Sequence, residues 1–422
     1  MQTRAAEIIK NILLALLAVT AVWLAVLAYS GYNGQEPEQR GVRTRFSELL
    51  GQTRYHVVFQ DQSNAGSVAA RPVRISVNTA FGRMSVQRNA EALDEAYERF
   101  GGLLGEAMER AEVQSEHISA QTLFETLGRP GVYYAYDGTF PLPLLARWLG
   151  VSTSLTFSAQ SMAVARESDG FYLLLVTPNG AERVRTEVDE NAFRTLLDQS
   201  RPDGSAFAFE RTEASVGRLD PLSLLSLGTV AMPTADAENP AAGKEYTTAL
   251  VEQMGFNPYV GSYTTADGRT AYEEGTSTLY LDDGGSLVLQ STSSGSLRAE
   301  SAELWAQVEY ARNLLERITE TGDARLYLTG AETKGDETVL TFDYYLSGAR
   351  IRLSAGAAAV IRFSGSTVQR MELTLRSYRL NGGTEALLPE IQAAAIERMG
   401  ANLTVCYVDA GGDSLSLGWD LN

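Results

Sequence analysis

The hydropathy pattern begins with a long uncharged run. From Ile12 to Tyr29 the chain reads ILLALLAVTAVWLAVLAY, which is 18 residues without a charge. As an α-helix this run is roughly 27 Å long, against a bilayer core of about 30 Å. We therefore predict that residues 1–30 form a short cytoplasmic stub followed by one transmembrane helix.

Charges on the two sides of this run bear on its orientation. Arg4 and Lys10 precede it and favour a cytoplasmic N-terminus, whereas three arginines between residues 40 and 45 weaken that bias. The alternative is a cleaved signal peptide, because Val26-Leu27-Ala28 would suit a small-residue cleavage site. The run exceeds the usual apolar region of about 7–15 residues, which favours a retained anchor. Either alternative exports the rest of the chain, so we expect a single-pass protein of the cell membrane with an extracytoplasmic C-terminal part.

One stripe of the predicted transmembrane helix is rich in small residues. Its members recur at alternating spacings of three and four: Asn11, Leu14, Ala18, Ala21, Ala25 and Ala28. Small residues let helix backbones approach closely in a membrane. We predict that this stripe binds a partner helix; the alternative is that alanine is simply common in this protein.

The remaining pattern predicts three folding units, of which the first covers residues 31–117. Alternating apolar and polar positions at 54–59 and 73–77 predict two half-buried strands. Apolar residues at helical spacing between 93 and 111 predict a helix that covers these strands. Gly101-Gly102 lies in the middle of that helix and favours a bend or break.

The middle unit is expected at residues 118–235. Its expected elements are a helix ending at Leu127, strands at 132–136, 171–176, 183–188 and 207–210, and a helix at 191–199. Pro178-Asn179-Gly180 separates two of these strands and favours a tight hairpin turn. Residues 229–244 have few large apolar side chains and two prolines, which indicates a linker or a long surface loop.

The third unit, residues 236–422, is rich in alternating segments. Its expected helices lie at 244–254, 300–319 and 385–399, and its expected strands at 271–272, 277–281, 286–290, 326–328, 338–346, 350–354, 360–363, 368–380, 403–408 and 415–419. The short turns between these strands predict antiparallel sheets. We therefore expect an α+β fold in which each antiparallel-sheet domain packs with one or two helices.

Composition narrows the classes of function. The chain has 52 acidic and 35 basic residues, which gives a formal net charge of -17. A nucleic-acid-binding face needs the opposite sign, so no nucleic-acid partner is expected. The lone cysteine, Cys406, excludes an intramolecular disulfide.

Candidate catalytic residues are few. His56 lies in a predicted strand and His117 at a loop-to-helix junction, and a structural role outweighs a catalytic one at both positions. The adjacent carboxylates Glu273-Glu274 and Asp282-Asp283 do not suit a glycosidase, because neighbours on a strand point to opposite faces. Cys406, in an apolar strand, is expected to be a core residue. We therefore predict a protein that is not an enzyme and has no catalytic, cofactor-binding or metal-binding residues.

Several stretches resemble a known family. They are Val132-Tyr-Tyr-Ala-Tyr136 with Phe140-Pro-Leu-Pro-Leu-Leu-Ala-Arg-Trp-Leu149, Met254-Gly-Phe-Asn-Pro258, Asp267-Gly268, Tyr272-Glu273-Glu274-Gly275, Asp283-Gly284, and Val405-Cys-Tyr-Val408 with Leu415 to Trp419. Together with the predicted architecture, they resemble the YycH/YycI-type regulatory proteins of the YycF/YycG (WalR/WalK) two-component system. Gly418 departs from the proline expected before the tryptophan.

The resemblance implies a membrane-anchored accessory protein that modulates a sensor histidine kinase of the YycG/WalK type and thereby cell-wall metabolism. It also implies contact between the two proteins' membrane helices and pairing with a second YycH/YycI-type protein. Two alternatives stay open: a secreted or anchored module that binds cell-wall polymer or another ligand, and a carboxylate-dependent hydrolase.

The small-residue stripe gives a first prediction. Replacing Ala21 and Ala25 by leucine adds bulk where the two helices would approach, so we expect weaker partner association in the membrane. Co-purification of the kinase with the full chain measures it. Unchanged association would show that the stripe is not the contact face.

Overall fold

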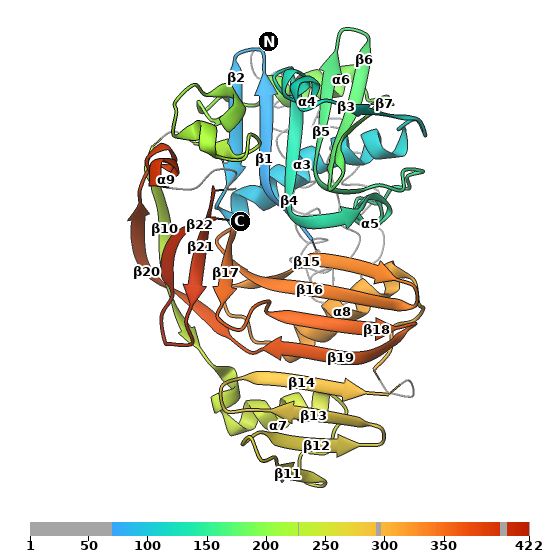
Figure 1. Ribbon diagram of the computed structural model, residues 1–422, viewed down its shortest axis with the longest axis vertical. Coiled ribbons are helices and arrows are strands. Elements are labelled where there is room, and N and C mark those ends of the chain that lie inside the picture. The colour runs from blue at the N-terminus through green and yellow to red at the C-terminus, as the bar shows by residue number, and fades with distance from the viewer. Residues whose placement is uncertain (1–69, 227, 293–296, 397–402, 422) are drawn as a thin grey trace, which may run out of the picture. The chain divides into compact units, whose positions relative to one another are not determined.

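The computed structural model describes residues 70–226, 228–292, 297–396 and 403–421, and they form an α+β fold with antiparallel sheets and several helices (Figure 1). These residues all belong to one compact unit. The predicted transmembrane helix, its small-residue stripe and the strand predicted at 54–59 lie outside the described residues. Within the described ranges, none of the helices combines the length and the apolar character needed to cross a membrane.

The first sheet has seven strands in the order β2-β1-β4-β5-β6-β7-β3, and every neighbouring pair is antiparallel. Its strands are β1 (Pro72–Thr79), β2 (Gly82–Gln87), β3 (Ser115–Ile118), β4 (Gly131–Pro141), β5 (Ser158–Glu167), β6 (Gly170–Thr177) and β7 (Gly180–Thr186). The predicted hairpin is β6–β7, which turns at Pro178-Asn179, and Gly180 takes the positive φ of 124°. The strand predicted at 73–77 is confirmed as β1.

Helices cover both faces of this sheet. On one face, α3 (Ala90–Glu109), α5 (Leu142–Trp148) and α6 (Glu190–Asp198) contribute to the main core. On the other face, α4 (Ala120–Leu127) and the short β8 (Ala206–Phe207) and β9 (Leu224–Leu225) enclose a smaller core around Tyr133 and Leu174. The strand expected at 207–210 is shorter, because Ala208–Glu210 form a 3-10 turn, as do Val216–Arg218.

The helix predicted between residues 93 and 111 is confirmed as α3. Asn89 caps it, since its side-chain oxygen accepts a hydrogen bond from the backbone of Ala92 at 3.0 Å. The predicted break at Gly101-Gly102 is wrong, because the helix continues through both glycines. Gly101 is buried, so tertiary packing there outweighs the low helix propensity of glycine.

The second sheet has eleven strands and follows the order β11-β12-β13-β14-β19-β18-β16-β17-β21-β22, with β15 paired to β16. Its strands are β11 (Ser262–Thr264), β12 (Thr270–Glu274), β13 (Ser277–Leu281), β14 (Ser286–Ser291), β15 (Arg325–Lys334), β16 (Glu337–Leu346), β17 (Ala349–Leu353), β18 (Ala359–Ser364), β19 (Thr367–Thr374), β21 (Leu403–Asp409) and β22 (Ser416–Leu421). Its helices are α7 (Lys244–Gln253) and α8 (Leu304–Ile318), which add their apolar stripes to the main core. One pair, β17 with β21, is parallel, so the expectation of purely antiparallel pairing is wrong at this position.

The linker predicted at residues 229–244 is wrong in its first half. Residues Val230–Glu238 form β10, which pairs antiparallel with β20 (Ser377–Leu387). In its second half the inward side chains are small, with Ala235 and Ala237 each 2% exposed, so only Val230 and Met232 at its start are larger buried apolar residues. A 3-10 turn, Pro240–Ala242, then leads to α7.

The helix expected at 385–399 is α9 (Glu390–Ile396), because residues up to Leu387 still belong to β20. Two of the expected unit boundaries fall within strands. The boundary after residue 117 lies in β3, and the boundary after residue 235 lies in β10. The seven-stranded sheet takes strands from both sides of the first boundary.

The strand character of β10 gives a second prediction. Ala235→Asp places a charge in a buried, apolar position and should lower the free energy of unfolding by about 2–4 kcal/mol. Ala231→Asp, on the exposed side of the same strand, is the matched control and should change it by about 0.5 kcal/mol or less. Urea unfolding measures both. Equal, small effects would mean that the segment is a loop.

Candidate functional site

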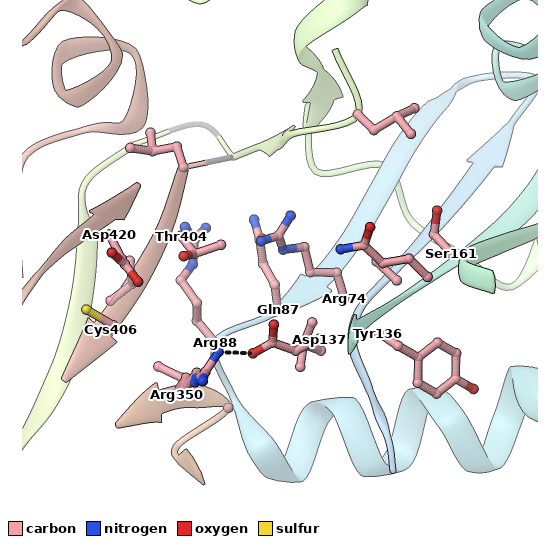
Figure 2. A pocket seen from close by; sticks show the side chains of 18 of the residues that line it. Arg74, Gln87, Arg88, Tyr136, Asp137, Ser161, Arg350, Thr404, Cys406 and Asp420 are labelled. Carbon is pink, nitrogen blue, oxygen red and sulfur yellow. Dashed lines mark ion pairs between the residues drawn. The ribbon is translucent and has the colours of Figure 1, made fainter. Parts of the chain in front are cut away.

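A cavity of about 170 Å³ lies between the seven-stranded sheet and the β16-β17-β21-β22 end of the larger sheet. Figure 2 shows its polar lining, with Arg74 and Ser161 on one side and Cys406 and Asp420 on the other. Both walls belong to the one compact unit. This cavity is the candidate functional site.

The first wall is a row of residues that crosses five neighbouring strands. Strand register places Gln87 opposite Arg74, Arg74 opposite Ala135, Ala135 opposite Ser161, and Ser161 opposite Val176. Residues directly opposite each other share a face of a sheet, and all five line the cavity. Ala135 has the smallest side chain in the row, so the middle of the row leaves space between longer side chains.

The second wall is built in the same way. Tyr345 of β16 lies opposite Arg350 of β17, which lies opposite Cys406 of β21. Thr404 and Asp420 form the next pair on the same face, between β21 and β22. Alternate residues such as Ile351 and Tyr407 point to the opposite face and pack in a separate apolar core.

A partly buried charge cluster joins the two walls. The carboxylate of Asp137, on β4, accepts a hydrogen bond from the hydroxyl of Tyr345 and lies 3.8 Å from the Arg350 guanidinium. Arg350 also forms an ion pair at 2.7 Å with Asp343, which is 1% exposed. Burial raises the pKa of Tyr345 well above its usual value, and Asp137 raises it further, so this hydroxyl keeps its proton and donates it.

Arg88 lies at the edge of the cavity in a strained conformation. Its φ of 58° is in the left-handed region, which is uncommon for a residue with a side chain. The guanidinium forms an ion pair with Glu390 of α9, which is 3% exposed, and donates to the Ser226 hydroxyl at 2.8 Å. These contacts hold the side chain in place and compensate for the backbone strain.

Charges of both signs line the cavity, namely Arg74, Arg88 and Arg350 with Asp137, Asp220 and Asp420. Burial lowers the pKa of Arg74, while the nearby Tyr133 and Asp137 act in the opposite direction.

Two of the three aspartates that line the cavity have arginine partners. Asp137 is paired with Arg350, and Asp420 forms an ion pair with Arg352. Across the described ranges, no group of three or more His, Cys, Asp or Glu side chains is arranged to hold a metal ion.

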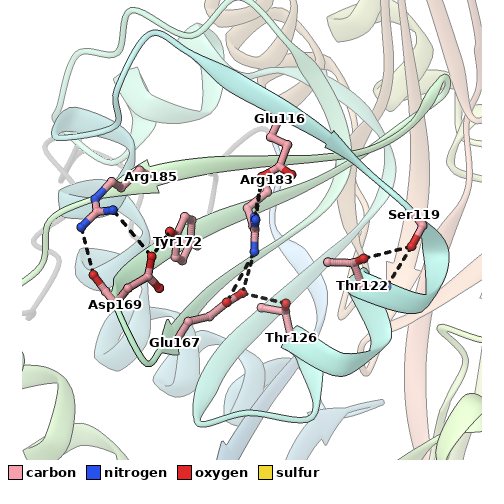
Figure 3. A network of polar contacts seen from close by, with 9 residues as sticks. All are labelled: Glu116, Ser119, Thr122, Thr126, Glu167, Asp169, Tyr172, Arg183 and Arg185. Atoms are coloured by element: carbon pink, nitrogen blue, oxygen red, sulfur yellow. Dashed lines mark hydrogen bonds and ion pairs between the residues drawn. The ribbon is translucent and has the colours of Figure 1, made fainter.

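A second polar cluster has a structural role (Figure 3). Arg183 of β7 contacts Glu116 of β3 at 2.6 Å and Glu167 of β5 at 3.2 Å. Glu167 also accepts a hydrogen bond from Thr126 of α4 at 2.9 Å. These contacts fasten the edge strand β3 and helix α4 to the sheet.

Of the candidate catalytic residues weighed from the sequence, His56 lies outside the described residues, and the described ones lie apart from the cavity with one exception. His117 lies in β3 rather than at a loop-to-helix junction, and its ring contacts Glu182 at 2.9 Å. Glu273-Glu274 are exposed on β12, and Asp282 accepts a hydrogen bond from the Ser286 backbone in a turn. Cys406 is the exception, because it is both buried, as expected, and part of the cavity lining.

Sequence reasoning missed the main lining residues. Arg74 is a charged residue in a strand of alternating apolar and polar positions. That pattern by itself predicts only an exposed side chain. Its role arises from cross-strand register with Ala135 and Ser161, and no local pattern encodes that register.

Comparison with known proteins adds no relative to this description. No protein family model, curated protein or solved structure matches the chain.

The lone cysteine gives a prediction for the cavity. Burial raises the pKa of the Cys406 thiol to about 11. Since the thiolate is the reactive form, alkylation by iodoacetamide at pH 8 should be roughly 10- to 100-fold slower than for an unfolded chain. The rate should rise with pH up to about 11. A rate at pH 8 equal to that in urea would contradict the buried position.

Proposed function

We propose that this chain is a membrane-anchored extracytoplasmic accessory protein that modulates a sensor histidine kinase of a two-component system governing cell-wall homeostasis. The observation that carries the proposal is the uncharged run from Ile12 to Tyr29 in front of a large acidic folded part. The family resemblance of the turn and aromatic stretches supports it. The partners are a kinase of the YycG/WalK type and a second YycH/YycI-type protein.

A physical route connects these features. A helix that packs better against one of two kinase states shifts the balance between them, and such couplings are typically about 1–3 kcal/mol. The small-residue stripe from Asn11 to Ala28 supplies the close contact in this proposal. In this proposal the folded part contributes binding, and two of the three aspartates that line its cavity, Asp137 and Asp420, form ion pairs with arginines.

The cavity favours a second candidate, which is a secreted or anchored ligand-binding module. This candidate predicts that the folded part acts without its membrane helix. A carboxylate-dependent hydrolase has less support, because the carboxylates of Asp137 and Asp420 each have an arginine partner.

A deletion experiment tests the proposed function. Removing the gene should change kinase-dependent transcription at least about fivefold, which corresponds to the lower end of typical coupling energies. The full chain should restore the output. A chain whose first 30 residues are replaced by a cleavable secretion signal, and which is therefore released, should not restore it.

Each outcome separates the candidates. Unchanged transcription after deletion would contradict a role in kinase regulation. Full restoration by the released form would contradict the need for a membrane helix and favour the ligand-binding module.

A further inference from the structure

The volume of the cavity limits what it can hold. A water molecule needs about 10–15 Å³ of such volume, so the 170 Å³ offer roughly ten water positions. A solute with about ten non-hydrogen atoms would displace most of this water. That size corresponds to an amino acid or a dipeptide.

The charges of the lining select the chemistry of such a solute. Arg74 lies on the first wall of the cavity, between Gln87 and Ala135 in the strand register. Asp220 also lines the cavity; its carboxylate accepts a hydrogen bond from the Leu222 backbone at 2.8 Å and has no ion-pair partner among the described residues. A solute with a single charge would meet both an opposite and a like charge here. A zwitterion would match both.

Arg74, Asp220 and the aromatic residue Tyr133 line the same cavity. Burial raises the pKa of Tyr133, and Arg74 and Asp220 act on it in opposite directions, so both charges are within electrostatic range of this residue. Two further lining residues, Val176 and Leu222, are apolar and only partly buried. They offer contact for a small aliphatic group.

We propose that this cavity binds a small zwitterion of amino-acid to dipeptide size, with its carboxylate on Arg74 and its ammonium group on Asp220. The carboxylate would accept charge-assisted hydrogen bonds from the guanidinium, and the ammonium group would donate to the aspartate. The site concerns the folded part alone, and its test needs no kinase, so it stands or fails separately from the proposed regulatory function.

The test uses the full chain purified in detergent. Calorimetry measures binding of alanyl-alanine and of each of the twenty amino acids. The same compounds are tested for protection of Cys406, which lines the cavity, from iodoacetamide. At least one compound should bind and slow alkylation. If none does either, the proposal is overturned.

Blocked forms of the binding compound test the two charges without any mutation. Its N-acetyl derivative lacks the ammonium group and its amide lacks the carboxylate, so each should bind at least tenfold more weakly. Equal binding of the acetylated form would show a site for anions, and equal binding of the amide a site for cations. Either result contradicts a zwitterion site.

Variants then assign each charge to a residue. Arg74→Gln should weaken the zwitterion at least tenfold but leave its amide unaffected, and Asp220→Asn should weaken the zwitterion but leave the acetylated form unaffected. Ala135→Leu should block binding, because the larger side chain fills the space in the middle of the first wall. Arg362→Gln, at an exposed position on β18 that pairs with Glu337, is the matched control and should bind normally. Normal binding by Arg74→Gln and Asp220→Asn would overturn the assignment.

Discussion

Asp137 is one point at which the two large sheets are joined. Its carboxylate comes from β4 of the first sheet, and its partners, Tyr345 and Arg350, come from neighbouring strands of the second. Removing one member of a buried charge cluster is costly, because the remaining charge loses its compensation. Arg350 in turn compensates the deeply buried Asp343, so one connected set of charges links the two sheets.

The cavity follows from this constraint. Charged and hydrogen-bonded side chains at the junction hold the two sheets in fixed positions. Apolar side chains cannot fill the space between them without burying those charges away from their partners. Along the first wall, Ala135 stands between Arg74 and Ser161 and leaves room where a larger residue would fill it. A site made in this way presents fixed charges to a solute before it arrives, which reduces the reorganisation needed on binding.

Local patterns explain which parts of the fold were predictable. The stripe of α3, the hairpin β6–β7 and the helix α8 were predicted from periodicity and turn residues that lie within a few positions of one another. Strand β10 was missed because two of its buried residues, Ala235 and Ala237, are small, and its pairing with the distant β20 is not visible in the sequence. The parallel pairing of β17 with β21 and the charged row of the cavity join residues far apart in the sequence, and only the assembled register brings them together.

A double-mutant cycle tests this junction most directly. Asp137→Ala and Tyr345→Phe each remove one side of the contact between the sheets, and urea unfolding gives the free energy of each single variant and of the double variant. We expect the two effects to be non-additive by at least about 1 kcal/mol, because the residues share one partly buried hydrogen bond. Additive effects would show that Asp137 does not couple the sheets and would contradict this account.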